Sequence, residues 1–215
     1  MPKLAFAHVD TWVFDLDNTL YPPQMRLFDQ IETRMTRYVM QALDVSQAEA
    51  DSLRRRYWAE YGTTLAGLMR VHDLDPGPYL DWVHEIDFTP LQADDALRAA
   101  IAALPGRKII YTNGTASYAE RVCVARGLGN LFDAIYGVEH AGYRPKPEAE
   151  AFSRIFARDG CDPRSAAMFE DDPRNLAAPH DMGLRTVLVA PEPIVAAHID
   201  HHTADLGGFL HGLRG

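Results

Sequence analysis

At 215 residues the chain is long enough for one α/β domain with a sizeable buried core and a smaller inserted subdomain. Its apolar fraction of 47% and charged fraction of 24% are ordinary for a globular protein, so extensive disorder is not expected. The formal net charge is −9 and no basic cluster is longer than residues 54–56, which argues against a nucleic-acid polymer as partner, because binding to its backbone needs a basic face.

Five short apolar runs predict buried strands, because each is bounded by Asp, Gly or Pro. They lie at residues 11–14, 108–111, 134–136, 166–169 and 186–189. Helical patterns separate the last four runs. This alternation predicts βαβ units and a mostly parallel sheet, an α/β fold in which ligands bind outside the carboxyl ends of the strands.

Residues 22–90, between the first two predicted strands, contain no convincing strand and are predicted to be helical. Apolar side chains recur at three- and four-residue steps over residues 27–42, which indicates an amphipathic helix. Ser46 followed by Glu49 resembles a capping box that opens a second helix. A turn at residues 75–78 precedes a further apolar-spaced segment. An all-helical insertion of this kind is expected to form a cap over the active end of the sheet.

Two carboxylates follow the first predicted strand, in the run Phe-Asp-Leu-Asp-Asn-Thr-Leu-Tyr at residues 14–21. Residues two apart in an extended chain point the same way, so Asp15 and Asp17 should converge on one site. Crowded carboxylates need a cation or hydrogen bonds, and their hard oxygens suit Mg²⁺. The alternative is an ordinary turn whose side chains bond to the local backbone.

Polar groups also follow the second predicted strand. The hydroxyl of Thr112, the amide of Asn113 and the backbone of Gly114 could donate to phosphate oxygens, although such a sequence is also a common turn. Lys146 lies between two prolines before a helical segment, with Pro147 expected in the first turn of the helix. A cation fixed there would anchor an anion. The alternative is an exposed surface lysine.

A cluster of acids follows the predicted strand at residues 166–169. Glu170, Asp171 and Asp172 are consecutive, which is costly unless a metal relieves their repulsion. The alternative is an acidic helix start, since carboxylates are favoured at the amino end of a helix.

In chain order, the Asp-x-Asp after strand one, the Thr after strand two, the isolated Lys and the later acidic cluster are similar to the motifs of the haloacid dehalogenase (HAD) superfamily. The resemblance covers nearly the whole chain, and four ordered motifs are more specific than any one. It implies a Rossmann-like core with a mostly parallel sheet and an inserted helical cap of the C1 type. The implied core is residues 1–21 and 91–215, and the implied cap is residues 22–90.

Three stretches resemble the pyrimidine 5'-nucleotidase branch of this superfamily, namely residues 14–22, 61–65 and 169–172. The resemblance implies a Mg²⁺-dependent phosphomonoester hydrolase that forms an aspartyl-phosphate and acts on UMP or CMP. The alternatives are a phosphatase for another small metabolite, such as a sugar phosphate or phosphoglycolate, and a phosphomutase. A non-enzymatic binding module and a dehalogenase fit less well, because every chemical position is occupied by a competent residue and Asp17 supplies the acid that dehalogenases lack.

The resemblance assigns a role to each motif. Asp15 would be the nucleophile, and Asp17 would protonate the leaving alkoxide and then activate water. Mg²⁺ would be held by the carboxylates of Asp15 and Asp171 and the backbone carbonyl of Asp17, with Glu170 or Asp172 acting through water.

The remaining motifs would bind the substrate. Thr112, Asn113, Gly114 and Lys146 would contact the phosphoryl oxygens, and Lys146 would keep Asp15 ionised. The cap would choose the leaving group, with candidate residues Tyr61, Thr63, Thr64 and Leu65, for which ordinary helix packing is the alternative.

The sequence also indicates the cellular setting of the protein. Cys123 and Cys161 are predicted to be reduced thiols of a cytoplasmic protein, because the chain opens without a basic and then apolar leader. No run of about 18 apolar residues is present, so no membrane span is predicted. A cluster of histidines at residues 198–202 fits no strong metal pattern and is interpreted as solvated surface. The expected partner is a small phosphorylated substrate, and the oligomeric state is not determined.

Overall fold

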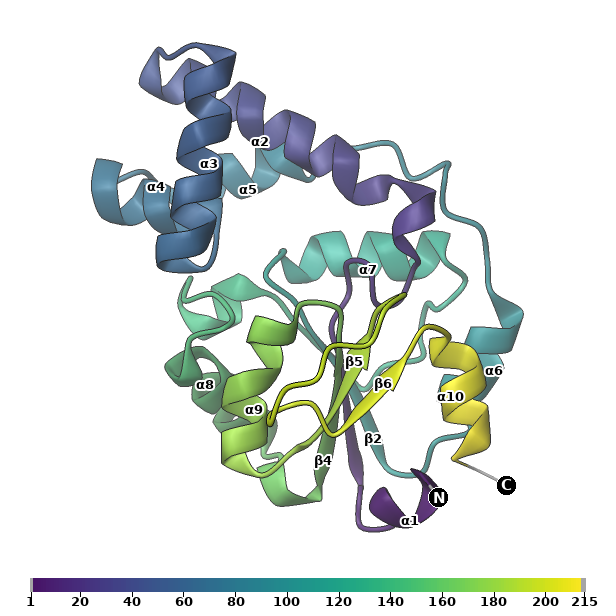
Figure 1. The fold of residues 1–215 in the computed structure, drawn as a ribbon. Helices are drawn as coiled ribbons and strands as arrows, with labels where there is room; N and C mark the ends of the chain where they lie inside the picture. Colours follow the sequence, from purple (N-terminus) through teal and green to yellow (C-terminus); the bar gives the residue numbers. More distant parts are fainter. Residues whose placement is uncertain (1, 214–215) are drawn as a thin grey trace.

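A computed structural model describes residues 2–213 of the chain. Its centre is a parallel six-stranded sheet with the order β3-β2-β1-β4-β5-β6 (Figure 1). The strands are β1 Thr11–Phe14, β2 Arg107–Tyr111, β3 Ala134–Tyr136, β4 Ala166–Glu170, β5 Arg185–Val189 and β6 His201–Thr203. The first strand in the chain lies between β2 and β4. The residues that follow β1, β2 and β4 are therefore neighbours at one edge of the sheet.

The five predicted strands are confirmed to within two residues, but β6 was not predicted. Three of its residues pair with β5, and the ring of His202 lies 2.7 Å from the carbonyl oxygen of Ala190. His201 and His202 are half-buried, so the interpretation of this stretch as solvated surface was wrong. A strand of three polar residues has no hydrophobic alternation from which it could be predicted.

Helices cover both faces of the sheet because its side chains alternate between two cores. Trp12 and Phe14 pack on one face with α6, α7 and α10, whereas Val13 packs on the other with α8 and α9. Both sets of side chains are almost completely buried. These helices are α6 Asp95–Ala102, α7 Ala116–Ala125, α8 Ala149–Asp159, α9 Ala177–Met182 and α10 Leu206–Gly212.

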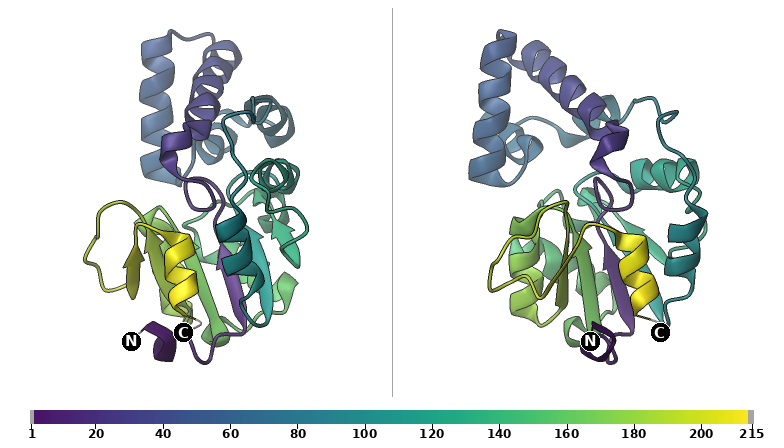
Figure 2. Two further views of the ribbon diagram at one scale, coloured as in Figure 1. Left: turned by 90° about the vertical axis from the view of Figure 1, so that its right-hand side faces the viewer. Right: turned by 45° about the vertical axis from the view of Figure 1, so that its right-hand side comes forward.

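Of the helices between β1 and β2, the first four α-helices lie beyond the carboxyl ends of the strands, whereas α6 packs on the sheet (Figures 1 and 2). The first four are α2 Leu27–Leu43, α3 Gln47–Tyr61, α4 Thr64–His72 and α5 Pro76–Val83. The predicted start of α3 is confirmed, because the hydroxyl of Ser46 accepts a hydrogen bond from the amide of Glu49. The predicted turn at residues 75–78 is instead the first turn of α5, which Asp75 caps. Proline is tolerated in the first turn of a helix, so the prolines at residues 75–78 belong to α5 and do not form a separate turn before it.

Short elements complete the chain: α1 Pro2–Ala5 and the 3₁₀ helices Pro23–Met25, Val138–Ala141, Pro163–Ser165 and Pro173–Leu176. Both cysteines are free thiols. None of the helices within residues 2–213 has the length and apolar character needed to cross a membrane.

Candidate active site

A cavity of about 520 Å³ lies between the helical insertion and the carboxyl edge of the sheet. The core lines it with residues that follow three neighbouring strands, among them Asp15 after β1, Thr112 after β2 and Asp171 after β4. Residues far apart in the chain thus meet in one place, because parallel strands all present their carboxyl ends at one edge.

Lys146 is buried at the centre of this site, with 1% of its surface exposed. Its ammonium donates to Asp15 Oδ1 at 2.6 Å, to Glu170 Oε2 at 2.6 Å and to the carbonyl oxygen of Tyr111 at 3.1 Å. Asn113 fixes the lysine backbone, accepting from its amide at 2.8 Å and donating to its carbonyl at 3.1 Å. The alternative of an exposed lysine is wrong.

The chain around Lys146 differs from its prediction in one detail. Helix α8 begins at Ala149, so Pro147 precedes the helix rather than lying in its first turn. The lysine is therefore held by Asn113 and by its carboxylate partners, and not by a helix amino end.

Asp15 lies almost completely buried at the end of β1. Burial raises the pKa of its carboxyl to about 7, with Glu170 adding to the rise and Lys146 opposing it. The hydroxyl of Thr19 donates to Asp15 Oδ2 at 3.0 Å. For Lys146, burial acts to lower the pKa, but Asp15 and Glu170 together raise it above its ordinary value. The lysine therefore stays charged and favours an ionised Asp15.

The three acids after β4 have different surroundings. Glu170 pairs with Lys146, and Asp172 caps the following 3₁₀ helix and pairs with Arg174 at 2.6 Å. The alternative of an acidic helix start thus holds for Asp172. Burial raises the pKa of Asp171 to about 10, and the charges of Glu170 and Asp15 add to the rise.

Oxygen atoms of Asp15, Glu170 and Asp171 lie within 4.8 Å of one another. One lysine does not balance three carboxylates. Burial is the main cause of the raised pKa values of Asp15 and Asp171, and the charges of the neighbouring carboxylates add to it. Several hard oxygen ligands with surplus negative charge are the donor set that Mg²⁺ or Ca²⁺ prefers. The residues present therefore fit a divalent cation.

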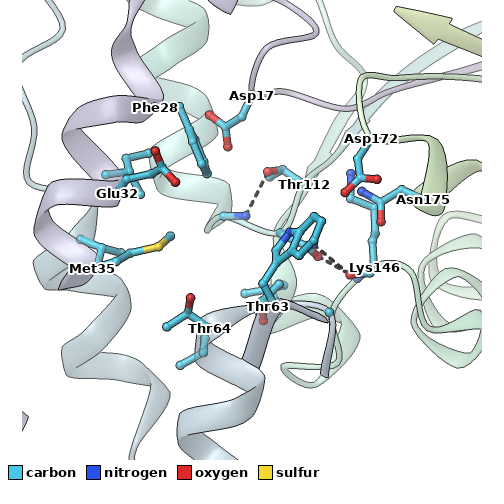
Figure 3. Close-up of a pocket in the computed structure, with 18 of the residues that line it drawn as sticks. Asp17, Phe28, Glu32, Met35, Thr63, Thr64, Thr112, Lys146, Asp172 and Asn175 are labelled. Atoms are coloured by element: carbon cyan, nitrogen blue, oxygen red, sulfur yellow. Dashed lines mark hydrogen bonds between the residues drawn. The ribbon is translucent and has the colours of Figure 1, made fainter. Parts of the chain in front are cut away.

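The loop after β2 supplies polar groups to the same cavity. Thr112 is 1% exposed, and its hydroxyl accepts a hydrogen bond from the amide of Gly114 at 3.0 Å (Figure 3). A side chain on Gly114 would come within 2.9 Å of the ring of Tyr118, so close packing requires a glycine here. Thr112, Asn113, Gly114 and Lys146 all line the cavity.

Asp17 also lines the cavity (Figure 3). Its Oδ1 accepts hydrogen bonds from the hydroxyls of Tyr21 at 2.6 Å and Tyr118 at 2.7 Å. Burial raises the pKa of Asp17, and both tyrosine hydrogen bonds oppose that rise.

Three polar residues that contact the predicted catalytic acids were not predicted: Thr19, Tyr21 and Tyr118. The first two lie four residues after Asp15 and Asp17, a spacing that brings side chains together when the chain turns after a strand. Tyr118 is separated from Asp17 by about a hundred residues, and nothing in its local sequence marks it.

The helical insertion forms the opposite wall of the cavity. Phe28, Glu32 and Met35 reach it from α2, and Thr64 from the start of α4 (Figure 3). Thr63 and Leu65 also line it, and the hydroxyl of Thr63 accepts from the amide of Ala66 to cap α4. Tyr61 instead packs against Tyr57, with ring centroids 5.9 Å apart.

The fold is shared with several solved structures. The putative HAD-hydrolase YfnB from Bacillus subtilis, bound to magnesium, gives a TM-score of 0.65 at 17% identity, over 96% of this chain and 99% of that one. The HAD phosphatase from Thermococcus onnurineus gives 0.61 at 17% identity, over 96% of both chains. L-2-haloacid dehalogenase from Xanthobacter autotrophicus gives a TM-score of 0.60 at 15% identity, over 96% of this chain and 99% of that one. These likenesses confirm the predicted fold class.

Sequence comparison gives the family. Phosphate metabolism protein 8 of Saccharomyces cerevisiae is 26% identical over 199 residues, which cover 81% of this chain. The match spans 60% of the length of that yeast protein. A model of the family described as haloacid dehalogenase-like hydrolase matches residues 9–183, from before β1 to the end of α9. The chain therefore belongs to the haloacid dehalogenase-like hydrolase family, as its ordered motifs predicted.

Proposed function

We propose that the protein is a magnesium-dependent phosphomonoester hydrolase in which Asp15 is the nucleophile. The observation that carries the proposal is the buried Asp15 carboxylate, 2.6 Å from the ammonium of Lys146, with the second acid Asp17 facing the same cavity. A buried cation beside a nucleophilic carboxylate favours its ionised form and attracts an anionic substrate. The HAD phosphatase with the same fold and the yeast phosphate metabolism protein support this choice of reaction.

Each residue of the cavity then has a role. Asp15 attacks phosphorus, and the resulting aspartyl-phosphate divides a difficult hydrolysis into two easier steps. Asp17 gives a proton to the leaving oxygen and later takes one from water. Thr112, Asn113 and Lys146 stabilise the charge on the transferring phosphoryl oxygens, which is the main requirement of phosphoryl transfer.

Asp15, Asp171 and the backbone carbonyl of Asp17 are the proposed ligands of Mg²⁺. The cation would supply positive charge that lowers the repulsion between the carboxylates and a phosphate dianion. Glu170 is bonded to Lys146, so its proposed contribution is to hold that lysine and to act on the cation through water.

We further propose pyrimidine 5'-nucleotides as substrates and a cytoplasmic location. A cavity of about 520 Å³ has room for a small organic monoester, and the wall opposite the phosphate site includes the apolar side chains of Phe28, Met35 and Leu80 beside the polar Glu32. Such a lining suits a planar base with polar edges. Another small phosphate ester, and a phosphomutase reaction, remain the alternative proposals, and the outcome of a substrate panel separates them.

A dehalogenase is the second candidate, because L-2-haloacid dehalogenase shares the fold. The carboxyl of Asp17 argues against it, since a halide leaves without a proton whereas an alkoxide needs one. Asp17 accepts hydrogen bonds from two tyrosine hydroxyls, which hold its carboxyl group in the cavity.

The test is phosphate release from a panel of monoesters, with and without Mg²⁺, by the wild type and by Asp15→Asn. The panel contains UMP, CMP, purine nucleotides, sugar phosphates and phosphoglycolate. Magnesium-dependent release that Asp15→Asn abolishes is expected, together with a preference for UMP or CMP. Release that needs a bisphosphate activator would identify a mutase, and halide release from 2-haloacids without Mg²⁺ would identify a dehalogenase.

A further inference from the structure

In the part of the chain that the structure describes, the side-chain hydrogen bonds to the Asp17 carboxylate go to a single oxygen. Tyr21 and Tyr118 both donate to the same oxygen, Oδ1, at 2.6 and 2.7 Å. Both tyrosines are 1% exposed or less. A phenol hydroxyl is protonated at neutral pH, so each tyrosine donates its proton to the carboxylate.

This arrangement distinguishes the two oxygens of Asp17. A carboxylate oxygen has two lone pairs, and two phenol donors occupy both of those on Oδ1. The other oxygen, Oδ2, is then the one that can carry a proton. Asp17 lines the cavity, so its carboxyl group lies beside the space in which a substrate would bind (Figure 3).

Resting on the function proposed above, we propose that Tyr21 and Tyr118 are positioning residues that fix Asp17 with Oδ2 directed at the leaving oxygen of the substrate. Neither tyrosine gives up its own proton or touches the reacting atoms. Without them the Asp17 side chain would be free to rotate, and a general acid that is misplaced by a fraction of an ångström loses much of its effect.

The surroundings of Tyr118 hold its ring in place. The imidazole of His84, at the end of α5, stacks on the ring with centroids 4.3 Å apart and planes 7° apart. On the core side, Gly114 leaves space for the ring, since a Cβ there would lie 2.9 Å from it. The last helix of the insertion therefore contacts the tyrosine that holds the acid.

The proton has a defined path in both half-reactions. In the first, an Asp15 oxygen bonds to phosphorus, the bond from phosphorus to the leaving oxygen breaks, and the proton on Asp17 Oδ2 moves to that oxygen. In the second, water bonds to phosphorus, the bond to Asp15 breaks, and Asp17 takes the proton of the water as inorganic phosphate leaves. The tyrosine protons stay on their oxygens throughout.

The test uses Tyr21→Phe, Tyr118→Phe and the double variant, with kcat/KM measured on two substrates. UMP has an alkoxide leaving group that needs a proton, whereas p-nitrophenyl phosphate releases an anion that is stable without one. Since kcat/KM reports steps up to release of the leaving group, only the first half-reaction contributes. The double variant is expected to lose about 100-fold on UMP, within the usual range of general acid catalysis, and less than about threefold on p-nitrophenyl phosphate.

Tyr136→Phe is the matched control. This buried tyrosine also donates to a carboxylate, Asp159 at 2.9 Å, but from β3 and outside the residues that line the cavity. It should leave kcat/KM on both substrates unchanged. Asp17→Ala gives the reference for complete loss of the acid, and its selective loss on UMP should exceed that of the double variant.

Equal losses on both substrates would mean that the tyrosines only support the fold, and no loss on either would mean that they do not position Asp17. Both results overturn the inference but leave the proposed phosphatase standing. If the wild type releases phosphate from neither substrate with Mg²⁺ present, the proposed function fails and the inference fails with it. If it acts on another alkyl monoester of the panel but not on UMP, only the nucleotide assignment fails, and the same comparison is made with that ester.

Discussion

At the scale of single residues, the site depends on the balance between one buried cation and its carboxylates. Lys146 contacts Asp15 and Glu170 at equal distances, and both pairs are shielded from water. A buried ion pair of this kind contributes little net stability, but removal of one partner leaves an uncompensated charge. The lysine therefore affects both folding and the ionisation of the nucleophile.

The variant Lys146→Met tests this balance. Its free energy of unfolding should fall by about 3–5 kcal/mol, because two carboxylates remain buried without their cation. Its kcat should fall by about 100-fold or more, since the variant lacks the cation that stabilises the charge on the transferring phosphoryl group. Urea denaturation and phosphate release measure the two effects.

The double variant Lys146→Met with Glu170→Gln separates stability from activity. It should recover part of the lost stability, because one unpaired charge is removed, but none of the activity. Lys108→Met is the control, since the hydrogen bonds of that ammonium within residues 2–213 go to the backbone carbonyls of Leu104 and Gly106. If Lys146→Met were as stable and active as this control, the proposed balance would be wrong.

At the scale of elements, the shape of the cavity wall depends on how closely α3 and α4 approach. Gly67 in α4 faces the ring of Tyr57 in α3, and a Cβ there would lie 2.2 Å from the ring carbon Cγ. Helices that meet through a glycine cannot keep their separation when a methyl group is added. Helix α4 carries Thr64 and Leu65 into the cavity, so its position also affects substrate binding.

The variant Gly67→Ala should therefore lower the free energy of unfolding by about 1–3 kcal/mol, the usual cost of overpacking, and should raise KM. The control is Gly77→Ala in α5, where a Cβ meets only Asp75 Oδ1 at an ordinary 3.4 Å. Thermal unfolding and steady-state kinetics of both variants provide the comparison. Equal stability of the two variants would contradict the close packing of α3 against α4.

At the scale of the whole molecule, the helical insertion and the core meet at His84. This side chain is 5% exposed, it ends α5, and it stacks on Tyr118 of α7. Burial lowers its pKa from 6.5 to about 3, and the positive charge of Arg121 adds to the effect. Between pH 6.5 and about pH 3, the imidazole of His84 is therefore neutral in the folded protein and protonated in the unfolded chain.

This shift predicts an acid-sensitive contact between the two parts. The unfolded chain binds one more proton than the folded protein between pH 6.5 and 3, so stability is complete above pH 6.5 and is lost as pH falls. At pH 5, protonation of this one imidazole in the unfolded chain should lower the free energy of unfolding by about 2 kcal/mol.

The variant His84→Phe has no group to protonate at this position, so its free energy of unfolding should fall less than that of the wild type between pH 7 and pH 5. The exposed His8, changed to Asn, should keep the wild-type pH dependence, and identical slopes for all three proteins would refute the prediction.

Much of the fold could be predicted because the signals are local. Short apolar runs gave five strands, and the spacing over residues 27–42 and the Ser46 cap gave two helices of the insertion. The strand β6 and the early start of α5 were missed. A three-residue polar strand has no hydrophobic periodicity. A proline in the first turn of a helix cannot be distinguished, from sequence, from a proline in a loop between elements.

The sequence by itself determined the family, the order of the motifs and the residue types that can perform the chemistry, because these depend on side chains next to strand ends. Only the tertiary structure decided which groups share a site. It showed that Lys146 is buried between two carboxylates and that Asp172 caps a 3₁₀ helix. It also showed that the hydroxyl of Tyr118 donates a hydrogen bond to Asp17, which is distant in the sequence. The physical reason is that burial, pairing and ionisation arise between segments distant in sequence, which no local pattern records.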